Sequence, residues 1–480
     1  MLKKTAEFSV VFRDKKREES FIEQHKIGAK SFTRERKLGF DKMMTMIIKK
    51  SNKSIQNSLN DMQLDLGKEV SISNSAYTQA RAKLNYTAFQ EYATMSSDMF
   101  YEDGEYEKYK DFRLLAIDGS VVTLPKSEDI SQEFNPMKVR CQIEDFKKEV
   151  PQARVSVLFD VLNTMAVDAS LTNKNKSEEN DLIAYDERTL ALQHLEYCKK
   201  DDLVVMDRGY PSYELFVKYN QTTNFLVRLK KTSFAKAKFL FDAHSEKKDV
   251  VLEINAHKYL KEMLKQENLS TKMKVRFVQV ILDNGTVEVL ATNVLDSHRL
   301  QTSDFKALYA KRWGIETYYD LIKNRLNLEN FTGLTSLAVK QDFYATVFLT
   351  NYEAMITYDL NEELRETTQE NKYVQKVNKA VSFNLIKHKV FDLLYNDEPI
   401  DTMLEQMEKL FLTNTIVMRP NRTSKPRLDK DAQKSTIATN TIHHLKRKKK
   451  MLGVDRVGGR KWYIYMLNLM ALRGGATPLS

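Results

Sequence analysis

The sequence predicts an α/β (α+β) fold, with a mixed sheet flanked by helices, an all-helical region before it and a β-rich insertion within it. Three observations predict this fold. Residues 1–108 show helical periodicity, residues 109–230 alternate short apolar strands with helical stretches, and residues 231–302 carry strand patterns with a strong hairpin signal. Helical patterns return at 303–400, which we expect to complete the core begun at 109–230, and basic clusters mark 401–480.

Length and composition support several domains and favour an anionic partner. The 480 residues exceed the roughly 250–300 at which one hydrophobic core stops growing. The 42% of hydrophobic residues is ample for a core, and 14 Gly with 8 Pro are too few for a low-complexity chain. The 76 Lys and Arg against 65 Asp and Glu give a net charge of +11. This excess favours a polyanion such as nucleic acid, although solvated surface lysines would produce it equally well.

Cysteine usage and hydropathy restrict the compartment and the metal ligands. Cys141 and Cys198 are too few for a disulfide framework or a Cys-rich zinc site, which predicts a reducing compartment such as the cytoplasm. Any metal would therefore need carboxylates or histidines, and none of the eight histidines forms a metal-spaced pair. The N-terminus lacks the apolar core of a signal peptide, and Asn351 and Glu353 interrupt the most apolar run, Tyr344–Leu360. We expect no membrane association.

The N-terminal segment is expected to be helical and basic. Phe40–Lys50 reads as an apolar helix with lysines at its end, where they suit the helix dipole. Ser73 is placed to cap a second helix through Leu84. That helix would expose three polar side chains: Gln79, Arg81 and Lys83. The pattern indicates a helix-turn-helix, and an ordinary helical bundle with a basic face explains it as well.

The core contains two short apolar strands that each end in an aspartate. Phe112–Ile117 is followed by Asp118-Gly119-Ser120, and Leu203–Met206 by Asp207-Arg208-Gly209. Aspartate is disfavoured inside strands, so each is either a turn former or a group presented at the sheet edge. Two carboxylates at neighbouring strand ends would converge and could share divalent cations. The remaining predicted elements are strands at Arg154–Val161, Met165–Leu171 and Asn224–Leu229, a helix at about Asn180–Cys198 and a helix opened by Pro211 and Ser212.

The insertion and the helix after it complete the pattern. Strands are expected at Val250–Ile254, Lys274–Leu282 and Val287–Val294, the last two joined by an Asn284-Gly285 hairpin turn.

A helix is expected from Asp304 to about Leu328. At 100° per residue it places four polar side chains within an arc of roughly 60° beside its apolar face: Tyr309, Arg312, Glu316 and Lys323. Such a stripe lines a cleft, or else reflects a plain ion pair between Arg312 and Glu316. Basic clusters follow at Arg419–Arg422 and Lys446–Lys450, then an apolar tail at Tyr463–Leu472.

These motifs together resemble a known family. Asp118-Gly, Asp207-Arg-Gly and Tyr309-x2-Arg312-x3-Glu316-x6-Lys323 are similar to the DDE transposases of bacterial insertion sequences with the YREK signature, the insertion-sequence-four type. The resemblance extends from the helical N-terminus, including Ser73 to Phe89, to about Glu329. It implies an RNase H-like core, with a β insertion filling the 109-residue interval between Asp207 and Glu316.

The resemblance also implies a function. The chain would bind the terminal inverted repeats of an insertion sequence and catalyse cleavage and strand transfer into target DNA. Asp118, Asp207 and Glu316 would hold two Mg²⁺ ions, with Mn²⁺ as a substitute. The resemblance further implies that the protein acts as a homodimer on double-stranded DNA. It would be located in the bacterial cytoplasm, at the nucleoid when bound to DNA. Two alternatives are a domesticated DNA-binding protein without activity and an RNase H-like nuclease without strand transfer.

Further residues receive roles by the same resemblance. Tyr309 would position a phosphate rather than act as a nucleophile, because the acidic triad is complete. Arg312 and Lys323 would bind backbone phosphates, and Arg208 likewise. Trp313 would stack on a displaced base or pack against the insertion. The tail at Tyr463–Leu472 is a candidate dimer contact or a closing helix of the monomer.

Overall fold

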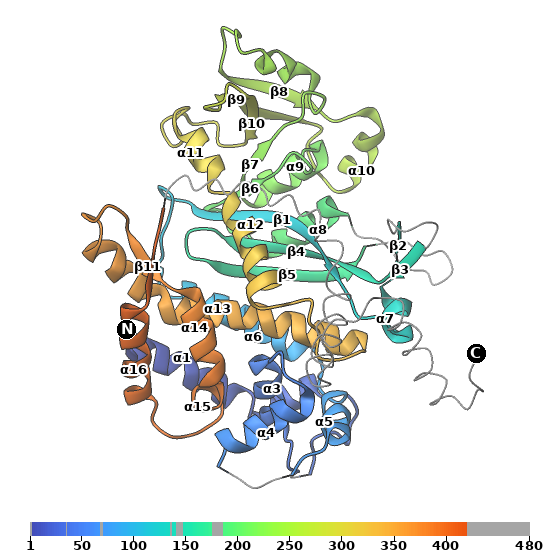
Figure 1. The fold of residues 1–480 in the computed structure, drawn as a ribbon. Helices are drawn as coiled ribbons and strands as arrows, with labels where there is room; N and C mark the ends of the chain where they lie inside the picture. The colour runs from blue at the N-terminus through green and yellow to red at the C-terminus, as the bar shows by residue number, and fades with distance from the viewer. Residues whose placement is uncertain are drawn as a thin grey trace, which may run out of the picture. The chain divides into compact units, whose positions relative to one another are not determined.

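A computed structural model describes residues 2–34, 36–67, 71–134, 137–140, 147–174 and 186–419 (Figure 1). Residues Met1–Met418 form one compact unit. Predictions for Cys141, for the basic clusters beyond Arg419 and for the tail at Tyr463–Leu472 lie outside the described residues. The predicted boundaries at 108, 230, 302 and 400 stay predictions.

An eight-stranded mixed sheet is the centre of the described chain. Its strand order is β5-β4-β1-β6-β7-β10-β9-β8. The first five strands are β1 (Arg113–Thr123), β4 (Gln152–Asp160), β5 (Met165–Asn173), β6 (Asp202–Met206) and β7 (Asn224–Arg228). β1, β6 and β7 run parallel, while β4 is antiparallel to both β1 and β5. This order, with one antiparallel strand among parallel ones, is that of an RNase H-like core, so the predicted fold class is confirmed.

The β-rich insertion lengthens the same sheet. Its strands are β8 (Asp249–Asn255), β9 (Lys272–Ile281) and β10 (Val287–Thr292), and β10 pairs antiparallel with β7. β9 and β10 form the predicted hairpin, whose turn places Gly285 at φ +79°, a conformation that glycine adopts without strain. Its helical elements are η2 (Ala235–Phe241), η3 (Lys258–Leu260) and α10 (Lys261–Gln266).

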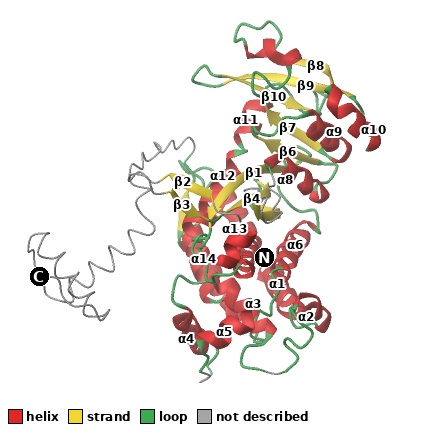
Figure 2. Cartoon of the chain, turned by 90° about the vertical axis from the view of Figure 1, so that its right-hand side faces the viewer, coloured by secondary structure: helices red, strands yellow, loops and turns green. Residues whose placement is uncertain are grey.

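A long buried helix joins the sheet to the N-terminal helices. α13 (Ser336–Thr367) packs on β5 and on two N-terminal helices, α3 (Phe40–Lys49) and α6 (Thr87–Tyr101). It lies between the strands and those helices in Figure 1, and Figure 2 shows the same separation of strands from N-terminal helices. Two of its polar side chains are fully buried but satisfied. Asn351 accepts from the Ala166 N–H at 2.8 Å, and Glu353 pairs with Lys379 at 2.8 Å. Among the described helices, none is long and apolar enough to cross a membrane.

The N-terminal helices form as predicted, with one correction. They are α1 (Leu2–Lys15), α2 (Glu19–His25), α3, α4 (Ile55–Asp65), α5 (Asn74–Arg81) and α6. Ser73 caps α5, its Oγ accepting from the Ala76 N–H at 3.2 Å. The expectation that Arg81 is exposed is wrong. Arg81 is 5% exposed and pairs with buried Asp342 at 2.7 Å, because α5 ends against the first turns of α13.

The remaining elements surround the core and the end of the described chain. They are α7 (Glu128–Glu133), β2 (Met137–Arg140), β3 (Lys147–Val150), α8 (Glu187–Gln193), η1 (His194–Tyr197), α9 (Tyr213–Thr222), α11 (Asp304–Ala310), α12 (Trp313–Asp320), the π-helical turn η4 (Leu321–Arg325), β11 (Gln375–Val377), α14 (Lys379–His388), α15 (Val390–Leu394), α16 (Asp401–Thr413) and β12 (Thr415–Val417). Sequence patterns missed the two-stranded sheet of β11 and β12, since three-residue strands leave no periodicity to read.

Candidate active site

Two aspartates lie side by side on adjacent parallel strands. Ile117 of β1 pairs with Met206 of β6, so the residues that follow, Asp118 and Asp207, occupy neighbouring positions. Asp207 directly follows β6 as predicted. Asp118 does not end its strand: β1 continues to Thr123, because its pairing with the antiparallel β4 persists that far. Asp118 is therefore presented from the middle of a strand, at the point where β6 stops.

The predicted third acidic residue reaches the same place from a broken helix. A continuous helix was expected from Asp304 to Leu328. Instead α11 ends at Ala310, α12 begins at Trp313, and α12 passes into the π-turn η4. The break leaves Arg312 between two carboxylates: its Nη2 donates to Glu316 Oε1 at 2.7 Å, and its Nη1 lies 3.5 Å from Asp118 Oδ2. Arg312 thus links Glu316 with Asp118.

Asp207 is held by two further side chains. The Tyr309 hydroxyl donates to its Oδ1 at 3.1 Å. Arg228 donates to the same oxygen from Nη2 at 2.7 Å and from Nε at 2.9 Å. Sequence reasoning missed Arg228. The register of the parallel strands would have indicated it: Met206 pairs with Val227, so the residues that follow them, Asp207 and Arg228, are neighbours.

Lys323 fastens the helical segment to β1 rather than pointing into solvent. Its Nζ donates to Ser120 Oγ at 2.6 Å and to the Val121 carbonyl at 2.7 Å, and burial lowers its pKa. The Tyr319 hydroxyl donates to the carbonyl of Asp118 at 2.7 Å. The π-turn widens the helix at Lys323, as such turns often do at functional sites. Two side chains of this segment thereby hold the backbone of Asp118 and of the residues that follow it.

The two predicted DNA-contacting residues outside the YREK set are both exposed. Arg208 follows Asp207 and faces solvent. Trp313 is 60% exposed, with the Arg312 guanidinium 5.1 Å from its ring centre. The insertion therefore does not bury Trp313.

The pKa of Asp118 is raised to about 6, first by burial and then by the charges of Glu316 and Asp207. The Gly119 N–H, which donates to Oδ1 at 2.8 Å, and the Arg312 charge oppose this rise. The positive charge near Asp118 is thus too small to offset the cost of burying its ionised carboxylate.

Asp207 behaves in the opposite way. Burial raises its pKa, but the Arg208 backbone N–H and the charges of Arg228 and Arg312 outweigh burial, so the net pKa is lowered. Two adjacent carboxylates therefore differ in proton affinity: burial dominates at Asp118, whereas the Arg208 N–H and the charges of Arg228 and Arg312 outweigh it at Asp207.

The chemistry of this donor set fits a divalent cation. Carboxylate oxygens are the ligands that Mg²⁺ and Mn²⁺ prefer. In the described part of the chain, no three Asp, Glu, His or Cys side chains are gathered closely enough to hold an ion as they stand. Arg312 occupies the position of a counter-charge between Asp118 and Glu316. The residues therefore fit a cation that takes over this neutralising role.

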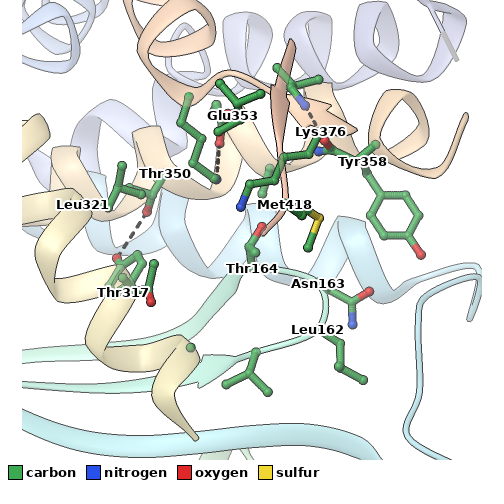
Figure 3. Close-up of a pocket in the computed structure, with 18 of the residues that line it drawn as sticks. Leu162, Asn163, Thr164, Thr317, Leu321, Thr350, Glu353, Tyr358, Lys376 and Met418 are labelled. Atoms are coloured by element: carbon green, nitrogen blue, oxygen red, sulfur yellow. Dashed lines mark hydrogen bonds and ion pairs between the residues drawn. The ribbon is translucent and has the colours of Figure 1, made fainter. Parts of the chain in front are cut away.

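A cavity of about 450 Å³ lies elsewhere along α12 (Figure 3). It is lined by Thr164, Thr317, Glu353, Lys376 and Met418 among others, and by none of the predicted site residues. The acidic residues and this cavity are separate features of the molecule.

Comparisons with known proteins bear on the family of the chain. The family profile described as a transposase DDE domain matches residues 109–352, slightly more than half of the chain. A comparison with curated proteins finds no match. Among solved structures, the cryo-EM structure of the piggyBac transposase synaptic complex with hairpin DNA aligns over 90% of this chain and 91% of its own, at 9% identity and a TM-score of 0.42. The family match spans Asp118, Asp207 and Glu316 together with the strands and helices that carry them. By this match the chain belongs to the transposase DDE domain family.

Proposed function

We propose that this chain is a metal-dependent DNA transposase of the YREK, insertion-sequence-four type. It would bind the ends of its own element, cleave there and join the freed 3′ end to target DNA. The observation that carries the proposal is that Asp118 and Asp207 lie at neighbouring positions of adjacent strands, while Arg312 contacts both Asp118 and Glu316. Every residue of the YREK pattern makes a contact at this place or on the strand that presents Asp118.

The three carboxylates would hold the divalent cations, for which two Mg²⁺ or Mn²⁺ ions are proposed. When bound, such a pair supplies an activated water or 3′-hydroxyl, and it stabilises the charge on the attacked phosphate and on the leaving oxygen. Both aspartates would be mostly ionised at neutral pH, since the pKa of Asp118 is raised only to about 6 and that of Asp207 is lowered. Tyr309 and Arg228 would hold Asp207 in position through its Oδ1.

Arg312 would change partners during the reaction. Its contact with Asp118 is long, at 3.5 Å, and the side chain of its other partner, Glu316, is 37% exposed. Cations at the carboxylates would release the guanidinium, whose planar donors suit a phosphate oxygen pair. Arg312 would then neutralise the DNA backbone beside the scissile bond.

The remaining contacts to DNA would come from exposed residues. Trp313 would stack on a displaced base, and Arg208 would contact a phosphate. Lys323 is proposed to position β1 and Asp118, since both of its hydrogen bonds are to that strand. The helices at 1–108 would hold the terminal repeats of double-stranded DNA, and a homodimer in the bacterial cytoplasm would bring two ends together.

The test uses the full chain with linear DNA that carries the element's own terminal inverted repeats. In Mg²⁺ or Mn²⁺ we expect nicks at the element ends and joined products on a denaturing gel. Asp118→Asn, Asp207→Asn and Glu316→Gln should each abolish both while preserving end binding in EDTA, measured by mobility shift. Asp111→Asn, at an exposed aspartate before β1, is the matched control and should retain both products.

Other outcomes separate the alternatives. Cleavage without joined products would indicate a nuclease of the same fold, and binding without either product a domesticated DNA-binding protein. Full cleavage by any of the three carboxylate variants would refute the site.

A further inference from the structure

A fourth carboxylate lies over both aspartate-bearing segments. Glu187 is in the first turn of α8, which Asp186 caps by accepting from the Thr189 N–H at 2.8 Å. Its side chain packs against Gly119 and Gly209, which follow Asp118 by one position and Asp207 by two. The carboxyl group thus bridges the two segments that present the proposed cation ligands.

The two glycines serve this approach rather than a special backbone conformation. Neither has a φ in the left-handed region, so an L-residue could adopt either backbone. A Cβ at residue 119, however, would lie 3.1 Å from Glu187 Cγ and 3.2 Å from Oε1. A Cβ at residue 209 would lie 3.4 Å from Oε2. One carboxyl oxygen therefore faces each glycine, and a side chain at residue 119 would require Glu187 to shift by a few tenths of an ångström.

A buried hydroxyl beside this group points to a ligand. Tyr210 is 1% exposed, and among the described residues its hydroxyl has no hydrogen-bond partner. Burial raises its pKa first, and the charges of Asp118 and Glu187 raise it further, so the hydroxyl lies within range of both charges. A buried hydroxyl without a partner costs free energy, about 1–3 kcal/mol, unless water or a ligand shell satisfies it.

Arg154 holds Glu187 when no cation does. Its Nη1 donates to Glu187 Oε1 at 2.9 Å from β4, next to the strand that carries Asp118. The Glu187 side chain remains 42% exposed, so it is neither buried nor locked by this pair. Partly exposed ion pairs of this kind are weak, roughly 0–1 kcal/mol, and yield to a divalent ion.

We propose that Glu187 is a fourth carboxylate of the divalent-cation centre, alongside Asp118, Asp207 and Glu316. The inference rests on the proposed metal-dependent function. It is favoured because Mg²⁺ and Mn²⁺ take about six oxygen ligands, while Asp207 already accepts three donors on Oδ1 and Glu316 is engaged by Arg312. Glu187 supplies oxygens at the junction of the two aspartate segments, from an element independent of both.

The test measures Mn²⁺ binding to the full chain without DNA, by isothermal titration calorimetry and by the loss of the free-ion signal in electron paramagnetic resonance. Glu187→Gln should weaken binding at least about tenfold, the range seen for removal of groups that support a metal site. Glu196→Gln, at an exposed glutamate just after α8, is the matched control and should leave binding unchanged. Thermal unfolding of each variant checks that the fold is retained.

A third variant separates a ligand from a structural ion pair. Arg154→Gln breaks the ion pair but keeps the Glu187 carboxylate, so Mn²⁺ should bind as tightly as to the wild type or more tightly. If Arg154→Gln weakens binding as much as Glu187→Gln does, Glu187 acts only through its ion pair and the inference is wrong.

Asp118→Asn distinguishes this inference from the proposed function. Loss of Mn²⁺ binding in Asp118→Asn but not in Glu187→Gln would overturn the fourth ligand and leave the proposed centre standing. Unchanged binding in both Asp118→Asn and Asp207→Asn would overturn the proposed metal centre itself.

Discussion

Replacing Asp118 by asparagine is expected to stabilise the cation-free protein at neutral pH while it abolishes catalysis. The pKa of Asp118 is about 6 in the folded chain against 3.8 in the unfolded chain, mainly because the carboxyl group is buried. Since the folded pKa is the higher one, protonation of Asp118 favours the fold. This contribution is fully present below about pH 4 and is lost as the pH rises through 6.

The size of the effect follows from that difference in pKa. A difference of 2.2 corresponds to about 3 kcal/mol of unfolding free energy lost above pH 7. The side chain is 24% exposed, and solvent screening reduces the expected gain in Asp118→Asn to about 1–3 kcal/mol at pH 8. At pH 5, where the folded carboxyl is mostly protonated, the gain should be about half as large.

Urea unfolding in EDTA at pH 8 and pH 5 measures both values. Asparagine keeps the shape of the side chain, and its Oδ1 can still accept from the Gly119 N–H. Asp111→Asn, at an exposed position, should change the unfolding free energy by less than about 0.5 kcal/mol at either pH. The reasoning fails if Asp118→Asn is no more stable than wild type at pH 8, or if its gain is the same at both pH values.

Three further substitutions test other parts of the site and the fold. Arg228→Gln removes a charge that lowers the pKa of Asp207, so the pKa of this carboxyl, followed by NMR titration in EDTA, should rise; an unchanged pKa would contradict the contact. Lys323→Met leaves two acceptors on β1 without their donor and should cost about 1–3 kcal/mol in urea unfolding. An unfolding free energy within about 0.5 kcal/mol of wild type would instead favour a pure phosphate contact. Arg81→Met leaves the buried carboxylate of Asp342 without its cationic partner and should lower the unfolding free energy by about 3–5 kcal/mol. Wild-type stability together with weaker binding of element ends would instead indicate that Arg81 contacts DNA.

Much of the architecture could be predicted because it depends on patterns among residues close together in the sequence. The strands at Arg154–Val161 and Leu203–Met206, the hairpin at Asn284-Gly285 and the cap at Ser73 each rest on residues within a few positions of one another. Local periodicity, turn chemistry and capping need no tertiary partner to be read. The fixed spacing of Tyr309, Arg312, Glu316 and Lys323 is local in the same sense.

The errors arise where distant segments determine the outcome. The strand through Asp118 continues because β4 pairs with it, and the expected single helix breaks before Trp313. Arg81 looked like an exposed polar residue and is buried, since Asp342 arrives from a helix about 260 positions later. An ion pair between residues so far apart in the sequence cannot be predicted from the residue pattern of either segment.

The sequence by itself determined the fold class and the transposase DDE domain family, and it predicted three acidic site residues, because these inferences rest on residue types at fixed spacings. The tertiary structure decided which groups surround each carboxylate. Strand register brings Arg228 to Asp207, while Asp118 has no such partner and keeps a raised pKa. It also decided that Lys323 holds β1 and that Glu187 lies over both aspartate segments. These placements depend on register and packing between segments far apart in the chain, and only the folded molecule specifies them.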